Sequence, residues 1–176
     1  MLSNLILIGM LVFLILFAVT MIMHIICMVP YVPTNMRTVD AMIKAAKLRK
    51  RDVVFDLGCG DARLLIESER RHGTQARGFE IAPLIYFLAI GRKFLFRSKV
   101  QIHFKNFFND NLSEANVIFC YLIPKVMPNL AEKIKKECKK GTKIISNTFH
   151  IPGLKPHKVI KKNPLKRTPS IYIYHV

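Results

Sequence analysis

Residues 53–63 read VVFDLGCGDAR, and they carry the clearest structural signal in the chain. The run VVFDL is apolar and short, with charged residues before it, which is typical of a buried β-strand. Gly58 and Gly60 follow at once and allow the backbone to turn tightly and to approach a ligand closely. Residues 62–72 then show the pattern of a helix with charged residues on its outer side. The segment therefore predicts a strand, a glycine turn and a helix.

The rest of the chain alternates between the same two patterns. Further strands are predicted at residues 76–80, 100–104, 116–122, 142–149, 158–161 and 170–175. Further helices are predicted at residues 38–48, 83–97 and 124–138. This alternation predicts an α/β fold with a doubly wound, mostly parallel, Rossmann-like sheet of seven strands, in which the last strand runs antiparallel.

The first 36 residues differ from the rest, because they contain no Asp, Glu, Lys or Arg. Residues 4–29 are apolar on every side and long enough to cross about 30 Å of hydrocarbon as a helix. A signal peptide would have a basic start and a shorter apolar run, and a buried soluble helix is disfavoured because no face is polar. We expect residues 1–36 to form a transmembrane anchor with a Pro-rich linker, and residues 37–176 to form one domain.

Charge predicts the orientation of this anchor. No Lys or Arg precedes it, whereas Arg37, Lys44 and Lys47 follow closely. The positive-inside rule therefore places residues 37–176 in the cytoplasm, or in the equivalent matrix of an organelle. The formal net charge is +17, and the last 39 residues hold nine Lys and Arg without an acid. Such charges favour an anionic lipid surface by about 1 kcal/mol each, although charge alone leaves RNA binding open.

Composition excludes several classes of protein. Disorder is excluded, because 51% of the residues are hydrophobic and apolar runs continue beyond residue 50. The four cysteines are isolated and form no C-x-x-C pair, so neither a disulfide framework nor a zinc site is expected. We therefore expect no metal.

Three kinds of nucleotide ligand compete for the glycine turn. A P-loop needs Gly-Lys-Ser/Thr, which is absent. A dinucleotide fold needs a third glycine at position 63, where this chain has Arg63. Asp56 and Asp61 place negative charge at the turn, which would repel a diphosphate but suits a cation. A glycine turn without any ligand is the remaining alternative.

Glu80 adds a second requirement for the ligand. It lies at the end of the next predicted strand, 22 positions beyond Gly58. A carboxylate there can accept hydrogen bonds from both hydroxyls of a ribose. S-adenosylmethionine (SAM) meets both requirements, because it carries a sulfonium, an ammonium and a ribose but no phosphate.

The run D-L-G-C-G-D-A-R followed by Glu80 resembles motif I and the succeeding acid of class I SAM-dependent methyltransferases. The resemblance implies that residues 37–176 are a SAM-dependent methyltransferase domain. The residues that it implies for SAM binding in this region are Asp56, Gly58, Cys59, Gly60, Asp61, Glu80 and Ile81. For the Cys59 side chain we expect a small filler and no nucleophile, because no histidine lies near it in sequence.

A narrower resemblance covers nearly the whole chain. The chain is similar to the small membrane-anchored family that includes lysine methyltransferases of the ATP synthase c-subunit and of the mitochondrial adenine nucleotide carrier. A hydrophobic span and the segment PYVPT at residues 30–34 precede motif I, as in that family. The segments YLIP at 121–124 and SNTFHIPG at 146–153 also resemble it. The resemblance implies that Tyr31 and Thr34 cover the cofactor.

Two positions depart from the family pattern. Ala62 stands where glycine is usual, and alanine is small enough to fit. Asn106 stands where an acid often reads the adenine amino group, and its amide oxygen can accept the same hydrogen bond. Phe107 or Phe108 is placed to stack on the adenine ring, with packing in the core as the alternative for either.

The end of the fourth predicted strand faces the methyl group in this fold. Tyr121 is our candidate catalytic residue, which orients the acceptor or accepts its proton; a tyrosine packed on the sheet is the alternative. The sequence at 121–124 is not Asn/Asp-Pro-Pro-Tyr, which argues against methylation of adenine amino groups or glutamine amides.

The sequence and the resemblance together predict a membrane-anchored, SAM-dependent protein-lysine N-methyltransferase acting on a protein at or in the same membrane. One alternative is a methyltransferase of a lipid, quinone or other small amphiphile. Another is a non-catalytic, basic, membrane-anchored interaction protein that retains the fold. The helix predicted at 83–97 is apolar almost all round, which predicts either complete burial or an outer face that contacts lipid or a membrane-embedded substrate.

Overall fold

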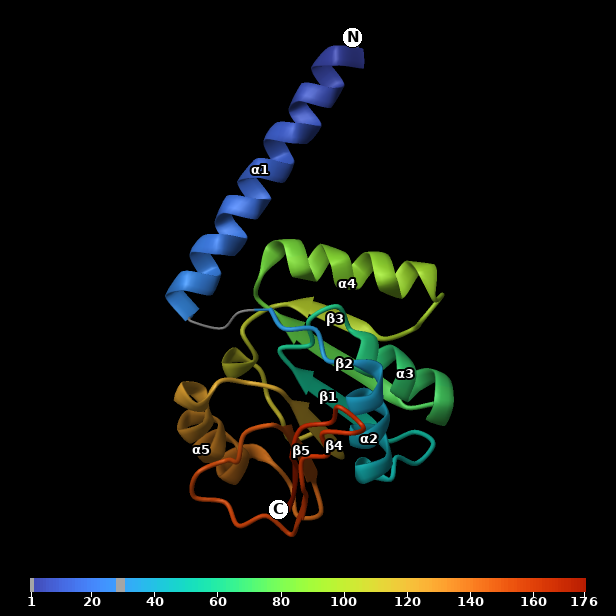
Figure 1. Cartoon of the computed structure of the whole chain (residues 1–176), viewed down its shortest axis with the longest axis vertical. Helices are drawn as coiled ribbons and strands as arrows, with labels where there is room; N and C mark the ends of the chain where they lie inside the picture. Colours follow the sequence, from blue (N-terminus) through green and yellow to red (C-terminus); the bar gives the residue numbers. More distant parts are fainter. Residues whose placement is uncertain (1, 28–30) are drawn as a thin grey trace.

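The computed structural model describes residues 2–27 and 31–176, with the side chains of the first helix described as far as Ile22. In these residues, seven strands form one sheet in the order β3-β2-β1-β4-β5-β7-β6 (Figure 1). They are β1 (Val53–Leu57), β2 (Gln75–Glu80), β3 (Gln101–Phe104), β4 (Val117–Cys120), β5 (Lys143–Asn147), β6 (Lys158–Ile160) and β7 (Ile171–His175).

The sheet is parallel except at one strand. β1 pairs with β2 and β4 in parallel, and β2–β3 and β4–β5 are parallel as well. β7 runs antiparallel to both β5 and β6. This is the predicted doubly wound, mostly parallel α/β sheet, so the prediction of the fold class is confirmed. The strand order reverses between β1 and β4, and a crevice for a ligand is expected at the carboxyl ends of these strands.

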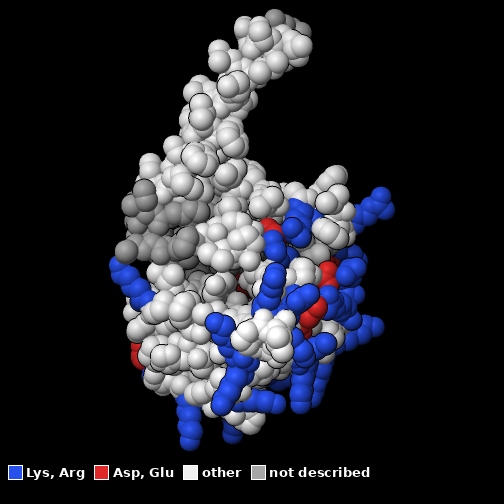
Figure 2. Space-filling view, viewed as in Figure 1, with Lys and Arg blue, Asp and Glu red and all other residues white. Residues whose placement is uncertain are grey.

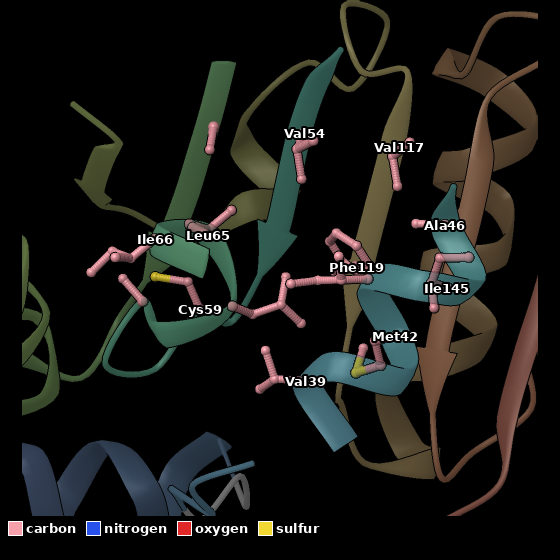
Figure 3. Close-up of a cluster of buried hydrophobic side chains, with 14 of the residues drawn as sticks. Val39, Met42, Ala46, Val54, Cys59, Leu65, Ile66, Val117, Phe119 and Ile145 are labelled. Carbon is pink, nitrogen blue, oxygen red and sulfur yellow. The ribbon is translucent and has the colours of Figure 1, made fainter. Parts of the chain in front are cut away.

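Helices cover both faces of the sheet. The helices of the domain are α2 (Met36–Ala46), α3 (Arg63–His72), α4 (Pro83–Leu95) and α5 (Met127–Glu137), with 3₁₀ turns η1 (Phe107–Asn109) and η2 (Pro124–Val126). Residues of α2, α3 and α4 pack with one face of the sheet, where Val39, Met42, Leu65 and Phe119 belong to one buried cluster (Figure 3). Residues of η1 and α5 pack on the opposite face.

Several predicted boundaries shift for local reasons. α2 begins two residues earlier than predicted, because Asn35 caps it: the Asn35 side chain accepts the N–H of Thr38 at 2.9 Å. The helix predicted at 124–138 is divided into η2 and α5, and Pro128 lies in the first turn of α5, where its missing N–H costs nothing. β5 ends before Thr148, whose φ of 67° is incompatible with a strand.

The apolar N-terminal segment forms one helix, α1 (Leu2–Cys27). Its residues Leu2–Ile22 have a mean hydropathy of 3.1, and only 6% of the most apolar window is buried. Its length and composition fit a membrane span. The predicted end of the span at residue 29 and Pro30 of the PYVPT segment lie outside the described residues.

Two glycines with opposite surroundings test the packing of this core. A Cβ at Gly78 on β2 would lie 2.6 Å from Leu65 Cδ1 and 2.7 Å from Cys59 Sγ, whereas a Cβ at Gly91 on α4 would meet nothing within 4 Å. We expect Gly78→Ala to reduce the free energy of unfolding by about 1–3 kcal/mol, because the added methyl group overpacks the core.

Gly91→Ala is the matched control. It is expected to raise the free energy of unfolding by about 0.5–1 kcal/mol, because alanine favours a helix interior. The free energies of unfolding of both variants would be measured by urea denaturation in detergent micelles. Equal stabilities of the two variants would contradict the close approach of β2 to the glycine turn.

Candidate active site

A cavity of about 490 Å³ lies at the point where the strand order reverses. Its walls come from the turn after β1, the end of β2, the segment before η1, and the residues that follow β4 and β5. Residues 31–34, which we call the strap, close another side. All predicted site residues border this one cavity: Tyr31, Thr34, Asp56, Gly58, Cys59, Gly60, Asp61, Glu80, Ile81, Asn106, Phe107 and Tyr121.

The turn after β1 requires both of its glycines. Gly58 and Gly60 have φ values of 80° and 57°, in the left-handed region that other residues avoid. A Cβ at Gly60 would also lie 2.9 Å from Tyr31 Cε2, and one at Gly58 would lie 3.3 Å from Leu122 Cδ2. The backbone therefore forms the floor of the cavity, with the strap and the end of β4 in direct contact with it.

Ala62 explains why glycine is usual at its position. Its φ is 59°, and it is completely buried at the start of α3. Alanine fits the available space, as expected. However, the left-handed backbone conformation costs a residue with a Cβ about 1 kcal/mol relative to glycine.

Glu80 is fixed in place by backbone hydrogen bonds. Its Oε2 accepts the N–H of Gly60 at 3.0 Å, and its Oε1 accepts the N–H groups of Ile81 and Ala82, both at 2.9 Å. The carboxylate thus joins the glycine turn to the end of β2 on the cavity wall. This is the position at which an acid can accept the hydroxyls of a ribose.

Asp56 is a buried carboxyl at the end of β1. Burial raises its pKa well above the usual value, and the negative charges of Glu80 and Asp61 raise it further. Asp56 and Glu80 make the interior of the cavity favourable for a cation, because a positive charge would offset both the burial of Asp56 and its repulsion by Glu80. The chemistry of this donor set therefore fits the sulfonium and ammonium groups of SAM.

Asp61 was expected to place negative charge at the turn, and the structure pairs this charge with two arginines. Its Oδ2 lies 2.7 Å from Nη2 of Arg63 and 3.0 Å from Nη2 of Arg92. Burial raises the pKa of Asp61, but the hydrogen bonds and charges of the two arginines outweigh it and hold the pKa below its usual value. Asp61 therefore carries compensated charge and positions the turn.

Arg63 holds the strap against the turn. Its Nη1 donates to the Thr34 carbonyl at 2.7 Å, while its Nε donates to Asp61 at 2.8 Å. Burial raises the pKa of Tyr31, and Asp61 adds to this, although the neighbouring Arg63 acts in the opposite direction. In sequence, Arg63 indicated only the missing third glycine of a dinucleotide site, and nothing indicated Arg92. The sequence signal available for the Asp61–Arg63 pair was the arginine two positions after the aspartate of motif I.

The segment around η1 forms the wall expected for adenine. The Asn106 side chain is exposed and accepts the N–H of Phe108 at 3.0 Å, so one lone pair of its amide oxygen is already used. Phe107 is buried in the core, whereas Phe108 is half-buried and borders the cavity. Core packing thus accounts for Phe107, and Phe108 presents the more accessible ring.

Tyr121 and Phe149 border another side of the cavity, where the acceptor is expected. Their rings are nearly parallel at 18°, with centroids 6.5 Å apart, and both border the cavity. Tyr121 is half-buried, so part of its surface is exposed. Phe149 was quoted in sequence only as part of a family segment, because nothing local indicated that the residues after β5 reach the cavity.

Cys59 and Ile81 complete the predicted set. The Cys59 side chain is buried in the cluster of Figure 3, and burial, with Asp56 and Glu80 next in size, raises the pKa of its thiol well above the usual value. The thiol is therefore neutral and packs as a filler.

In the described part of the chain, no group of three or more His, Cys, Asp or Glu is arranged to hold a metal ion.

Residues 56–158 match the family described as the ANTKMT methyltransferase domain, and this match includes motif I and the cavity lining outside the strap and Met42. The chain belongs to this family. It is a SAM-dependent methyltransferase, and the cavity described above has the charge, the glycine turn and the acid after β2 that SAM requires.

Two relatives and one solved structure define the similarity. A protein of Saccharolobus islandicus (strain REY15A) named protein-lysine N-methyltransferase is 36% identical over 83% of this chain and 92% of its own length. The adenine nucleotide translocase lysine N-methyltransferase of Mus musculus is 26% identical over 84% of this chain, which spans 63% of that protein. An RNA methyltransferase from Salinibacter ruber, crystallised with S-adenosyl-L-homocysteine, has a TM-score of 0.77 and 28% identity, covering 82% of this chain and 94% of that one.

Glu80 is the acid whose removal tests the cofactor site. We expect Glu80→Gln to weaken SAM binding roughly ten- to a hundredfold, because the charged acceptor for the ribose is lost. Isothermal titration in detergent measures the dissociation constant. Glu114→Gln is the control, because Glu114 pairs with Arg77 on the surface and does not border the cavity. Equal affinities of the two variants would place SAM elsewhere.

The raised pKa of Asp56 predicts pH-dependent binding. A bound cation favours the ionised carboxylate, so SAM binding is expected to release a proton and to strengthen as the pH rises above the usual pKa range of an aspartate. Titration in buffers of different ionisation enthalpy measures the proton released. In Asp56→Asn the proton release is expected to disappear.

Without SAM, the stability of the folded protein is expected to fall as the pH rises, which is opposite to the trend for SAM binding. A carboxyl whose folded pKa is raised keeps its proton when the unfolded chain has lost it. Its contribution to stability is therefore complete below the unfolded pKa of about 3.9 and is lost as the pH rises toward the folded value. An unchanged pH dependence of unfolding in Asp56→Asn would argue against a buried, protonated Asp56.

Proposed function

We propose that this methyltransferase is a membrane-anchored protein-lysine N-methyltransferase whose substrate is a protein at or in the same membrane. The observation that carries the proposal is the relation to the Saccharolobus islandicus protein-lysine N-methyltransferase, which extends over 92% of that protein. The mouse relative, named for the adenine nucleotide translocase, supports a membrane protein as the substrate.

The acceptor side of the cavity suits a lysine side chain. SAM, when bound, supplies the methyl group on a positively charged sulfur. A lysine amine must be deprotonated to accept it, and a free amine has a pKa of about 10.4. Leu122, Ile123 and Val126 make this side apolar, and desolvation beside a cation lowers the pKa of an amine.

The rings of Tyr121 and Phe149 would orient the lysine side chain of the substrate. Aromatic faces bind both an aliphatic chain and an ammonium group, which are the two parts of lysine. The Tyr121 hydroxyl has no hydrogen-bond partner among the described residues, and we propose that it orients the amine or accepts its proton.

Membrane anchoring is supported by the surroundings of α1. The core helix of a soluble protein is mostly buried, whereas α1 leaves nearly all of its apolar side chains exposed between Leu2 and Ile22. We propose that α1 crosses the membrane and that the basic residues after it, such as Arg37 and Lys44, keep the domain on the cytoplasmic or matrix side.

Anchoring would hold the cavity near the membrane. The strap begins at Tyr31, four residues after Cys27, the last described residue of α1. Four residues span at most roughly 14 Å. The acceptor would therefore be selected from lysines close to the bilayer surface.

RNA methylation is a second candidate function. The Salinibacter ruber structure is named an RNA methyltransferase, and a net charge of +17 suits any polyanion. The apolar acceptor side and the long exposed α1 favour the membrane-protein substrate over RNA.

One labelling experiment separates these substrates. Membranes and total RNA from cells that lack the protein are incubated with the full-length chain and SAM carrying a labelled methyl group. We expect label in a membrane protein and, in its peptides, a mass increase of whole methylene units on lysine. Label in RNA would establish the second candidate function, and label in the organic extract would establish a lipid or quinone substrate.

Tyr121→Phe is the matched variant for this assay. It keeps the ring beside Phe149 and removes only the hydroxyl, so the affinity for SAM is expected to stay the same while turnover falls about a hundredfold. If turnover is unchanged, Tyr121 packs against the acceptor without orienting it.

A further inference from the structure

One side of α4 presents an apolar surface away from the domain. Phe87, Leu88, Phe94 and Leu95 have 54%, 49%, 86% and 76% of their surface exposed. Together with Leu84 and Gly91 they follow helical i, i+3, i+4 spacing, so they form one continuous stripe without a charged residue. We call these six residues the α4 stripe.

The opposite side of α4 already contacts the sheet. Ile85 and Ala89 are buried, and Tyr86 and Ile90 pack against the buried cluster of that face. The alternative that the whole helix is buried is therefore wrong for its outer side. A surface helix normally turns polar residues outward, and a contiguous exposed apolar patch marks an interaction surface.

The stripe is continuous with the apolar surface of α1. The Thr20 hydroxyl of α1 accepts the N–H of Leu84 at 3.1 Å, so the lower part of α1 meets the first turn of α4. α4 runs across the direction of α1 at this contact (Figure 1). If α1 crosses the bilayer, α4 is then oriented to lie along the bilayer surface.

Charge around the stripe agrees with this orientation. Lys93, Arg97 and Lys99 lie at the C-terminal end of α4 and just beyond it, where their long side chains can reach lipid phosphates. On the face shown in Figure 2, Lys and Arg gather over the domain, whereas the described part of α1 carries none. An apolar helix face bordered by basic residues is typical of a helix in the membrane interface.

We propose that the α4 stripe inserts into the headgroup region of a lipid bilayer, beside α1, as a second membrane contact. This inference rests on the proposed membrane anchoring. Ile81 and Ala82 border the cavity and directly precede α4, so the contact would fix the cavity rim at the membrane surface. The enzyme would then methylate lysines at the level of the lipid headgroups.

The chain contains no tryptophan, so a single introduced tryptophan reports its own surroundings. The full-length chain with Phe94→Trp is reconstituted into vesicles of phosphatidylcholine and phosphatidylglycerol, with and without brominated acyl chains. We expect a blue-shifted emission that brominated lipid quenches by about half or more, because the indole lies at the acyl boundary. Phe94 is the most exposed residue of the stripe, so the substitution does not disturb the core.

Val159→Trp is the matched control. Val159 is exposed on β6, at the opposite edge of the sheet from β3 and therefore from α4, and its indole is expected to emit as in water without quenching. Flotation of the vesicles reports anchoring separately, and methyl transfer to lysine is measured independently of both.

Each other outcome overturns the inference in a distinct way. A chain that floats but shows water-like, unquenched emission from Phe94→Trp is anchored by α1 alone. A blue-shifted but unquenched emission means that a protein, either the substrate or a second copy, covers the stripe. A chain that does not float contradicts the proposed anchoring itself, even if lysine methylation persists.

Discussion

Glu80 joins the two strands on which the site depends. One carboxylate oxygen accepts the N–H of Gly60 and the other accepts those of Ile81 and Ala82. These bonds fix the turn after β1 relative to the end of β2, so the floor and one wall of the cavity form a single rigid unit. The same carboxylate, together with buried Asp56, gives this unit its preference for a cation. The position of the glycine turn and the preference for a cationic cofactor therefore both depend on the Glu80 carboxylate.

The charges of the molecule are separated in space. On the face shown in Figure 2, Lys and Arg gather over the domain, whereas Asp56, Asp61 and Glu80 border the cavity together with Arg63 and Lys105. A surface of this kind attracts anions, and an interior of this kind attracts a cation. A cationic cofactor in the cavity would lie close to the Glu80 carboxylate, and to Asp56 once it has lost its proton, whereas most of the basic residues behind the net charge of +17 do not border the cavity.

Much of the fold was predictable because buried parallel strands have a strong local signal. VVFDL was bounded correctly at both ends, since charges precede it and glycines follow. The twelve predicted site residues border one cavity, because a doubly wound sheet brings the carboxyl ends of its strands together. What was not predictable depends on contacts between distant segments. The hydrogen bond from Arg63 to Thr34 spans 29 positions, and the ion pair of Arg92 with Asp61 joins α4 to the glycine turn. Contacts between such distant residues leave no periodic pattern in the sequence.

The strap has a consequence for how the enzyme responds to its surroundings. Tyr31 rests on Gly60 at the cavity floor, and the Thr34 carbonyl is held by Arg63, while the other end of the same segment leads to α1. The strap therefore contacts the cofactor cavity at Tyr31 and Thr34 and continues along the chain toward α1. If α1 crosses the membrane, as proposed, any movement of α1 that displaces the strap would also change the shape of the cavity.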